Sequence, residues 1–365
     1  MLIFLLSPKR CDQPDVLTQS LVSRVLTRYN GYNRFSSLSA EGNFSVIEHE
    51  LFTRSSLNPI LSPSDMPYPC DCVCNPATHL VDGEVLMLIR VIDQEGSSHI
   101  TVARSKDGLT DWRIEDHPLI APNDSGARWP VAGSPFDTPF EAYGSEDPRL
   151  TYLADRGEYV IAYTGYSNLG AGVCLATTTD FKSVNRFGLV LAPNNKDASV
   201  FPRKINGRYW MMHRPALGDM EHIWLVESED LIHWGRPWCI IEERGGPWWD
   251  GDKVGGGPPP IETPDGWLVI FHGVKSTSHG PIYRVGLALL DLENPRRVIR
   301  RLPRWVFGPK ADYESTGFIP GVVFPTGTII KGDDLFLYYG AADTRIAVAQ
   351  TKVQTLLDAL KEEGK

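Results

Sequence analysis

Residues 159–181 read YVIAYTGYSNLGAGVCLATTTDF, and this stretch contains the pattern that decides the fold. A short apolar run at 159–163 is followed by a polar loop and a second short apolar run at 172–176. The polar turn Thr179-Asp180 then precedes Phe181. Short apolar runs bounded by Gly, Asn and Asp are typical of β-strands. We therefore interpret the stretch as two strands joined by a polar loop and closed by a turn.

The same form occurs five times along the chain. First strands are predicted at 85–91, 159–163, 209–212, 267–271 and 335–339. Second strands are predicted at 100–103, 172–176, 223–226, 285–289 and 346–349. The first strands begin 74, 50, 58 and 68 residues apart, and repeats of roughly 40–50 residues or more are typical of β-propellers. The sequence therefore predicts an all-β, five-bladed β-propeller, and five units disfavour the alternative of a two-sheet sandwich or jelly roll.

Two helices are predicted outside the repeats. Residues 15–28 place apolar side chains at helical spacing after a possible N-cap, Asp15. This helix either lies on the main body or makes a contact in a homo-oligomer. Residues 353–360 predict a short closing helix. The expected organisation is an N-terminal extension with one amphipathic helix (1–45), a propeller catalytic domain (46–352) and a C-terminal helix (353–365).

Composition excludes several classes of protein. The chain has 365 residues and a formal net charge of −9, so it lacks the basic surface that binds nucleic acid without regard to sequence. The apolar start at 1–6 is too short for a signal peptide. No apolar run approaches the roughly 18 residues of a membrane span. We therefore expect a cytoplasmic protein with no nucleic-acid or membrane partner.

The cysteine cluster Cys70, Cys72 and Cys74 suggests a metal site at first sight. A structural zinc site closes with a second pair of ligands at a spacing of two to four residues, and the chain has no such pair. A disulfide framework is unusual in a chain of this length. We therefore predict free thiols and no metal site.

The inner strands of a propeller line a central channel, and sites are built there. The segments just before the five first strands are rich in Gly and Pro and are expected to form irregular backbone facing this channel. They are 75–77, 145–149, 201–204, 255–260 and 321–325. In the second of them, Asp147 is a candidate proton donor, because a desolvated Asp can have a raised pKa. The alternative is a turn carboxylate paired with Arg149.

Basic and aromatic residues form a second set of candidates. Lys196, Arg214, Lys253 and His272 occur near inner strands of the third and fourth repeats. Positive groups that converge in an acidic protein indicate an anionic ligand such as phosphate, whereas unrelated surface charges are the alternative. Sugars stack on aromatic rings, so the aromatic candidates are binding platforms or core residues. They are Trp248, Trp249, Tyr283 and Phe318.

Several motifs in one order resemble glycoside hydrolase family 130 over residues 55–350. They include Asn75-Pro76-Ala77, Gly144-Ser145-Glu146-Asp147-Pro148-Arg149, His213-Arg214-Pro215, Lys253-Val254-Gly255-Gly256-Gly257-Pro258, Phe271-His272-Gly273, Tyr283-Arg284-Val285-Gly286 and Tyr339-Gly340-Ala341-Ala342-Asp343. Members of this family are five-bladed propellers, and most are inverting phosphorylases that release α-mannose 1-phosphate from β-mannosides. The chain departs from the family pattern at Lys196, Arg203 and Gly321, where Arg, Glu and Asn are usual.

The resemblance implies a role for each matching residue. Asp147 corresponds to the general acid, whose proton reaches the glycosidic oxygen through a mannose hydroxyl in some members. The residues that correspond to the phosphate site are Lys196, Arg214, Lys253, His272 and Tyr283. The residues assigned to substrate binding are Asn75, Arg90, Glu146, Arg149 and Asp343.

An inverting phosphorylase needs an acid and a cationic pocket that aims phosphate at the anomeric carbon. An inverting hydrolase needs a second carboxylate to activate water. We therefore hypothesise inverting phosphorolysis of a β-mannoside, with phosphate as co-substrate, a shortened sugar as second product and no metal or organic cofactor. The alternatives are an inverting β-mannosidase, with Asp197 or Glu262 acting on water, and a catalytically silent glycan-binding propeller.

Overall fold

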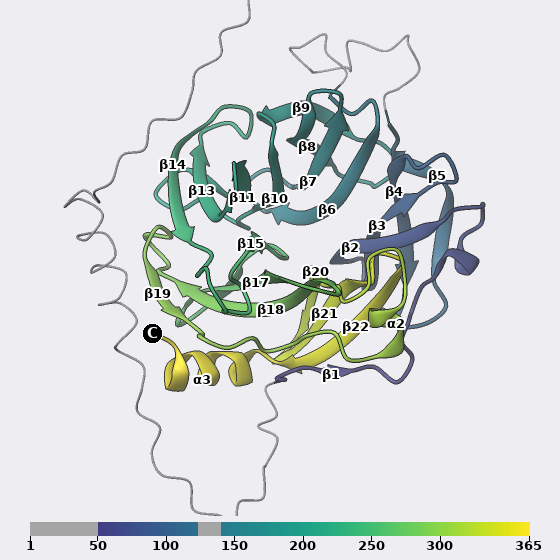
Figure 1. Ribbon diagram of the computed structural model, residues 1–365. Helices are drawn as coiled ribbons and strands as arrows, with labels where there is room; N and C mark the ends of the chain where they lie inside the picture. The colour runs from purple at the N-terminus through teal and green to yellow at the C-terminus, as the bar shows by residue number, and fades with distance from the viewer. Residues whose placement is uncertain (1–49, 123–139) are drawn as a thin grey trace, which may run out of the picture. The chain divides into compact units, whose positions relative to one another are not determined.

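Antiparallel strands make up most of the regular structure, so the fold is all-β (Figure 1). The computed structural model describes residues 50–122 and 140–365, which belong to a unit spanning His49–Lys365. The helix predicted at 15–28 lies outside the described residues. No helix in the described ranges is long and apolar enough to cross a bilayer.

Outward from the middle of Figure 1, the described strands fall into five groups of antiparallel neighbours. A parallel bridge between Ser98 and Gly144 joins the first two groups into one 8-stranded sheet. The first group is β2 (Cys72–Val81), β3 (Glu84–Ile92), β4 (Ser98–Ser105) and β5 (Arg113–Ile120), and the second is β6 (Gly144–Leu153), β7 (Glu158–Ser167), β8 (Gly170–Thr178) and β9 (Asn185–Leu191). The third is β10 (Asn195–Val200), β11 (Tyr209–Leu217), β13 (Ile223–Ser228) and β14 (Trp234–Ile241), with β12 (Met220–Glu221) beside β11. The fourth is β15 (Lys253–Gly256), β17 (Gly266–Thr277), β18 (Gly280–Leu290) and β19 (Val298–Arg301), with β16 (Ile261–Thr263) beside β17. The fifth is β20 (Val323–Lys331), β21 (Asp334–Ala341), β22 (Arg345–Lys352) and β1 (Thr53–Arg54).

All ten predicted strand segments are confirmed, because each lies within one of the second or third strands of these groups. The repeated polar turn that follows has a common mechanism. The Asp107 carboxylate accepts hydrogen bonds from two backbone N–H groups further along the turn, and Asp230 does the same. The hydroxyl of Ser105 accepts one further backbone hydrogen bond, and that of Ser228 accepts two. Such Asx turns fix the direction of the chain between strands.

The irregular backbone expected before the first strands is confirmed at 201–204 and at 257–260, whereas 75–77 and 145–149 lie within inner strands, which is a correction. β2, β6 and β10 each break register at one place, after Cys74, Glu146 and Lys196. The next residues, Asn75, Asp147 and Asp197, have φ values of 48°, 49° and 53°. Asn and Asp tolerate this left-handed backbone best among non-glycine residues. A bulge also re-aims the local side chain and accommodates a proline such as the one that follows Asn75.

Five apolar clusters hold the groups together, each between two neighbouring groups. Their members include Leu88 with Ile161, Val160 with Met211, Leu225 with Trp267, Leu287 with Leu337, and Ile89 with Tyr338. The last of these pairs joins the fifth group to the first. The inner strands follow the same order, since β2 packs beside both β6 and β20. Fully burying one such side chain stabilises the fold by about 1.5–3 kcal/mol.

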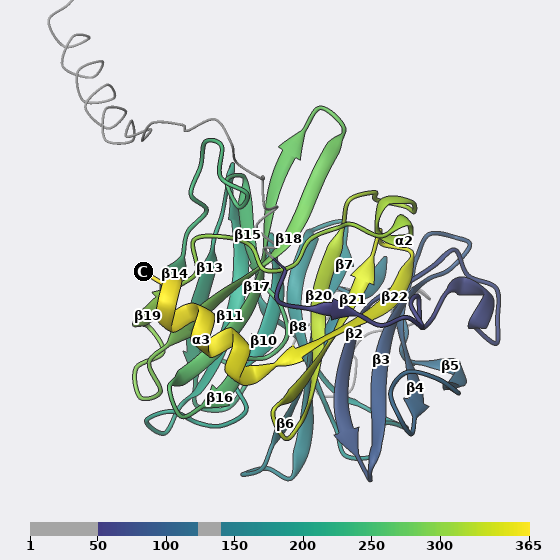
Figure 2. The same ribbon diagram turned by 90° about the horizontal axis from the view of Figure 1, so that it is seen from below.

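The described chain also has short helices. They are η1 (Pro63–Asp65), α2 (Asp312–Ser315) and α3 (Val353–Glu363). The predicted C-terminal helix corresponds to α3, which follows β22 and packs beside β18 and β19 (Figure 2). Its Leu356, Leu357 and Leu360 are buried in the cluster between the fourth and fifth groups.

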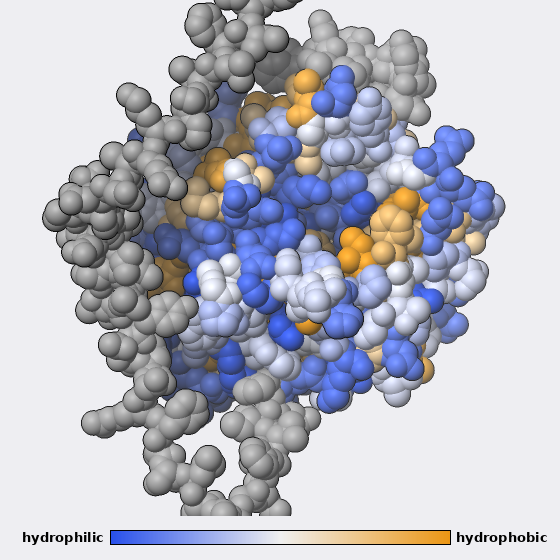
Figure 3. Space-filling view, viewed as in Figure 1, coloured by the Kyte–Doolittle hydropathy of each residue, from blue (hydrophilic) through white to orange (hydrophobic). Residues whose placement is uncertain are grey.

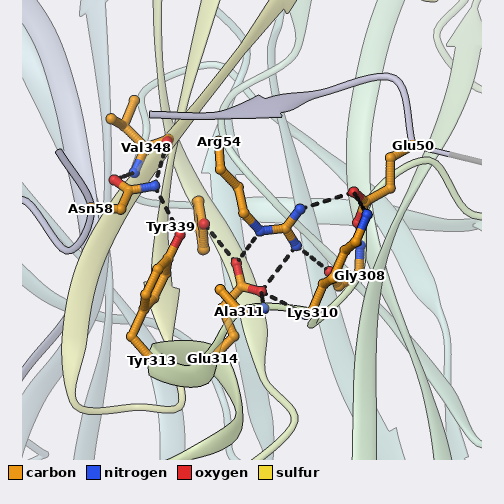
Figure 4. A network of polar contacts seen from close by, with 10 residues as sticks. All are labelled: Glu50, Arg54, Asn58, Gly308, Lys310, Ala311, Tyr313, Glu314, Tyr339 and Val348. Atoms are coloured by element: carbon orange, nitrogen blue, oxygen red, sulfur yellow. Dashed lines mark hydrogen bonds and ion pairs between the residues drawn. The ribbon is translucent and has the colours of Figure 1, made fainter. Parts of the chain in front are cut away.

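The early strand β1 completes the last group, since Thr53 and Arg54 pair with Gln350 and Ala349 of β22. A buried ionic network fixes it there (Figure 4). Arg54 Nε and Nη2 each donate a hydrogen bond of 2.9 Å to one carboxylate oxygen of Glu314. Glu314 also accepts hydrogen bonds from the Tyr339 hydroxyl and from two backbone N–H groups. The network therefore ties the beginning of the described chain to the segment that precedes β20.

Candidate active site

The inner ends of the five groups surround a polar cavity of about 440 Å³. Each inner strand contributes to its wall through a residue at or beside the strand, namely Asn75, Asp147, Lys196, Lys253 and Phe324. Hydrophilic residues gather over the middle of the face that Figure 3 shows, which is viewed as in Figure 1. The bulges in three inner strands therefore lie at the cavity wall.

Nine of the eleven predicted site residues line this cavity. They are Asn75, Arg90, Glu146, Asp147, Lys196, Arg214, Lys253, Tyr283 and Asp343. They come from all five groups, so residues that are up to 268 positions apart meet in one place. The other two, Arg149 and His272, lie buried behind the wall.

Carboxylates and one arginine form the first part of the site. Asp147 Oδ1 accepts hydrogen bonds from Asn75 Nδ2 at 2.8 Å and from Arg90 Nη1 at 2.9 Å. The other terminal nitrogen of Arg90 donates to Glu146 Oε1 at 3.0 Å. Glu146 Oε2 lies 3.8 Å from Lys196 Nζ. Arg90 thus holds the two neighbouring carboxylates side by side.

The pKa values of two carboxyl groups in the cavity are shifted in opposite directions. Burial raises the pKa of Asp147, but the positive charges of Arg90 and Arg149 outweigh burial and leave this pKa below its ordinary value. For Asp343, burial and the charge of Asp147 raise the pKa to about 6. Asp147 therefore favours the ionised form, which corrects the expectation that burial gives it a raised pKa, while Asp343 titrates near pH 6.

Cations and a tyrosine form the second part of the site. Lys253 Nζ lies 5.6 Å from the centre of the Tyr283 ring. Behind the wall, the His272 ring stacks against Tyr283, with ring centres 5.7 Å apart. Burial lowers the pKa of His272 to about 3, so this ring is neutral at physiological pH. Arg214 Nε lies 3.2 Å from Asp197 Oδ2 and 3.1 Å from Glu221 Oε2.

Arg149 does not reach the cavity, although it was predicted to bind substrate. Its guanidinium donates hydrogen bonds to the main-chain oxygens of Asp147, Gly256 and Gly257. It also donates one to the carboxylate of Asp197. The alternative of a side-chain pair between Asp147 and Arg149 is not formed either, because Arg149 contacts only the backbone of Asp147. Arg149 therefore connects β6 to β15 beneath the site.

Sequence reasoning missed part of the wall. The residues that line the cavity without having been assigned to it include the polar Asn194, Asn195 and Glu221 and the apolar Ile92, Ala171, Ala216 and Ile319. The aromatic candidates separate, because Tyr283 and Phe318 line the cavity whereas Trp248 and Trp249 do not. Phe318 is 71% exposed at the cavity. In residues 50–122 and 140–365, His, Cys, Asp and Glu form no group of three or more suited to a metal ion.

The two carboxylates considered for water activation are placed poorly for that task. Glu262 pairs with Arg203 at 2.9 Å and does not line the cavity. Asp197 lines it, but neighbouring cations hold its pKa at about 2. A carboxylate with so low a pKa is a weak proton acceptor. The cavity thus combines a carboxyl group held by arginine with several cationic side chains.

Comparisons with known proteins identify the family. A family model described as β-1,4-mannooligosaccharide phosphorylase matches residues 61–362. A β-1,2-mannobiose phosphorylase of Listeria innocua is 37% identical over 271 residues, or 73% of this chain and 70% of the relative. The solved structure of the Listeria innocua β-1,2-mannobiose phosphorylase, in complex with β-1,2-mannobiose, has a TM-score of 0.75 at 30% identity and covers 85% of this chain and 99% of that chain. The chain belongs to glycoside hydrolase family 130.

Two more distant relatives differ in activity. A β-1,4-mannooligosaccharide phosphorylase of Ruminococcus albus is 29% identical over 328 residues, or 86% of this chain and 92% of the relative. A solved structure from work on glycoside hydrolases of this family that target β-1,2 mannosidic linkages in Candida mannan is 27% identical, with a TM-score of 0.70 over 83% of this chain and 94% of that one.

Proposed function

We propose that the five groups of strands are the blades of a five-bladed β-propeller. The cyclic order of the five apolar clusters supports this proposal, because the cluster around Ile89 and Tyr338 joins the last group to the first. The pairing of β1 with β22 supports it as well, since an early strand that completes the last blade would close the ring. We propose residues 46–352 as the propeller domain, preceded by the extension 1–45 and followed by the helical segment 353–365.

We propose that the protein is an inverting β-mannoside phosphorylase that releases α-mannose 1-phosphate. The observation that carries this proposal is that one cavity holds both an acid and cations. Asp147 is bound there by Asn75 and Arg90, and Lys196 and Lys253 line the same cavity. A phosphorylase requires this arrangement, because phosphate is itself the nucleophile and needs only a cationic pocket to aim it.

Each step of the reaction has a group to perform it. The mannosyl unit binds Asn75, Arg90 and Asp343, and phosphate binds the cationic part with Tyr283 at its edge. A phosphate oxygen attacks the anomeric carbon as the bond from that carbon to the glycosidic oxygen breaks. The proton of Asp147 passes to the departing oxygen, directly or through a mannose hydroxyl, and the configuration inverts.

Phosphate binding also prepares the acid. The pKa of Asp147 is held down by neighbouring cations, so an isolated site favours its carboxylate. An anion bound on the adjacent cations offsets their charge and raises the pKa of Asp147. Protonation of Asp147 is therefore coupled to the presence of the nucleophile. No step requires a metal or an organic cofactor.

We expect a β-1,2 linkage in the preferred substrate. The relative at 37% identity is a β-1,2-mannobiose phosphorylase, whereas the relative named for β-1,4 linkages is 29% identical. Phe318, exposed at the cavity, offers an aromatic face on which the leaving sugar can stack. Hydrolysis of the same linkage is the second candidate function, since the family includes such hydrolases.

Purified protein incubated with β-1,2- and β-1,4-mannobiose, with and without phosphate, tests the proposal. We expect mannose 1-phosphate from the β-1,2 substrate, and only when phosphate is present. Free mannose released at a rate that does not depend on phosphate would instead establish the hydrolase. Binding of mannobiose without any turnover would instead support the catalytically silent glycan-binding protein.

A further inference from the structure

A buried carboxylate lies within the cationic part of the cavity. Asp197 is 2% exposed and lines the cavity wall. Its Oδ1 accepts a hydrogen bond from Arg149 Nη2 at 3.4 Å. Its Oδ2 lies 3.2 Å from Arg214 Nε and 3.6 Å from His272 Nε2. A negative charge in a pocket for an anion requires an explanation, because like charges repel most strongly where water is excluded.

The second oxygen of this carboxylate lacks a hydrogen bond. Among the described residues, Asp197 Oδ2 has no hydrogen-bond partner, and neither has Arg214 Nε or either ring nitrogen of His272. Buried polar atoms are nearly always paired. Asp197 and Arg214 line the cavity and His272 lies directly behind them, so atoms without a hydrogen bond gather at one wall, although Oδ2 and Arg214 Nε form an ion pair. This arrangement indicates a polar ligand, and an oxyanion that binds Arg214 arrives beside Oδ2.

The backbone is shaped to admit this carboxylate. A Cβ atom at Gly255 would lie 2.3 Å from Asp197 Oδ2 and 2.4 Å from His272 Cε1. Real Cβ atoms do not approach other atoms so closely, so any side chain at position 255 would displace Asp197 or His272. The glycine and the left-handed backbone of Asp197 together place the carboxylate where it stands.

The charge state of Asp197 decides what it can bind. Burial raises its pKa, but Arg214, His272 and Arg149 outweigh burial and bring the pKa to about 2. At neutral pH it is therefore only an acceptor of hydrogen bonds. An anion oxygen can approach it favourably if that oxygen carries a proton. Two other carboxylates differ: Glu221 is 26% exposed and screened by water, and one oxygen of Glu146 is already bound by Arg90.

We propose that Asp197 makes the anion pocket selective for oxyanions that carry a proton, namely hydrogen phosphate and hydrogen arsenate, over sulfate. This inference rests on the proposed use of phosphate. Sulfate has nearly the same size and charge as the hydrogen phosphate dianion, but it has no proton at neutral pH. A sulfate oxygen beside Asp197 would therefore face a carboxylate oxygen, and neither atom can donate a hydrogen bond. Asp197 is then a specificity-determining residue of the pocket.

Calorimetric titration of the full chain without sugar tests the proposal. The probes are phosphate, arsenate, sulfate and monofluorophosphate at pH 7.5, where only the first two carry a proton. We expect phosphate and arsenate to bind about 10- to 100-fold more tightly than the other two, the range typical of one charged hydrogen bond. In Asp197→Asn the amide can donate a hydrogen bond, so this preference should disappear while sulfate binding improves.

The control is Asp252→Asn, which removes a carboxylate that binds Lys275 outside the cavity and should keep the wild-type preference. If the wild type binds sulfate as tightly as phosphate, the selectivity proposal is overturned while the proposed use of phosphate stands. If it binds none of the four anions, both are overturned. A preference that persists in folded Asp197→Asn would remove Asp197 from this role. If that variant does not fold, the wild-type comparison alone decides.

Discussion

Replacing Asp147 with Asn isolates the proton that the proposed mechanism needs. The backbone at position 147 has a φ of 49°, which Asn tolerates as well as Asp. The Asn oxygen can still accept the hydrogen bonds that Asn75 and Arg90 now give to Asp147 Oδ1. The substitution therefore preserves the local geometry and removes the charge and the acid. We expect kcat to fall about 10²- to 10⁴-fold, which corresponds to about 2.7–5.5 kcal/mol of barrier.

The assay compares two leaving groups in phosphorolysis at saturating phosphate. β-1,2-Mannobiose needs protonation of the departing oxygen, whereas 2,4-dinitrophenyl β-mannoside does not. We expect Asp147→Asn to lose activity on the first and to keep, within about 10-fold, its activity on the second. Glu146→Gln is the matched control, since it changes the neighbouring carboxylate and should affect both substrates alike. Equal losses on both substrates in Asp147→Asn would refute the role of Asp147 as the acid.

Three further predictions concern stability and the anion pocket. Glu314→Gln breaks the buried pair with Arg54 and should lower the free energy of unfolding by about 3–5 kcal/mol in urea titrations; an unchanged midpoint would contradict the importance of this network. The pKa of Asp343 is raised from 3.8 to about 6 on folding, so its contribution to stability is complete below pH 4 and is lost as pH rises through 6. Asp343→Asn should therefore be more stable than wild type by about 1–3 kcal/mol at pH 8 and equal to it at pH 4, and a difference independent of pH would exclude this linkage. Lys253→Met should raise KM for phosphate about 10- to 100-fold with little change in KM for the mannoside in initial-rate kinetics, whereas a rise in the mannoside KM alone would place Lys253 with the sugar.

Local pattern was sufficient to predict the second and third strands of each group. Their apolar runs are bounded by turns that short polar side chains determine, as at Asp107 and Asp230. The motifs around Asp147 and Lys253 also predicted which residues gather at the cavity. Each motif occupies the same place in its group, at the inner strand, so the motifs meet where the inner strands meet.

Other features depend on contacts between distant segments and left no local signal. The bulges at Asn75 and Asp147 allow strands where proline and polar residues suggested irregular backbone. Arg149 was predicted to bind substrate, but the carbonyl oxygens of Gly256 at the end of β15 and of the next residue, Gly257, accept hydrogen bonds from its guanidinium. Glu221 joins the cavity through Arg214, and nothing in the sequence around it indicates that contact.

The most direct test of the central claim is the identity of the phosphorus-containing product formed from β-1,2-mannobiose. A ³¹P and ¹H NMR time course with wild-type protein and phosphate follows this product from the first turnover. The account predicts the α anomer of mannose 1-phosphate together with an equal amount of mannose, and no reaction when phosphate is omitted. Mannose as the sole product, in an amount that does not depend on phosphate, would contradict it.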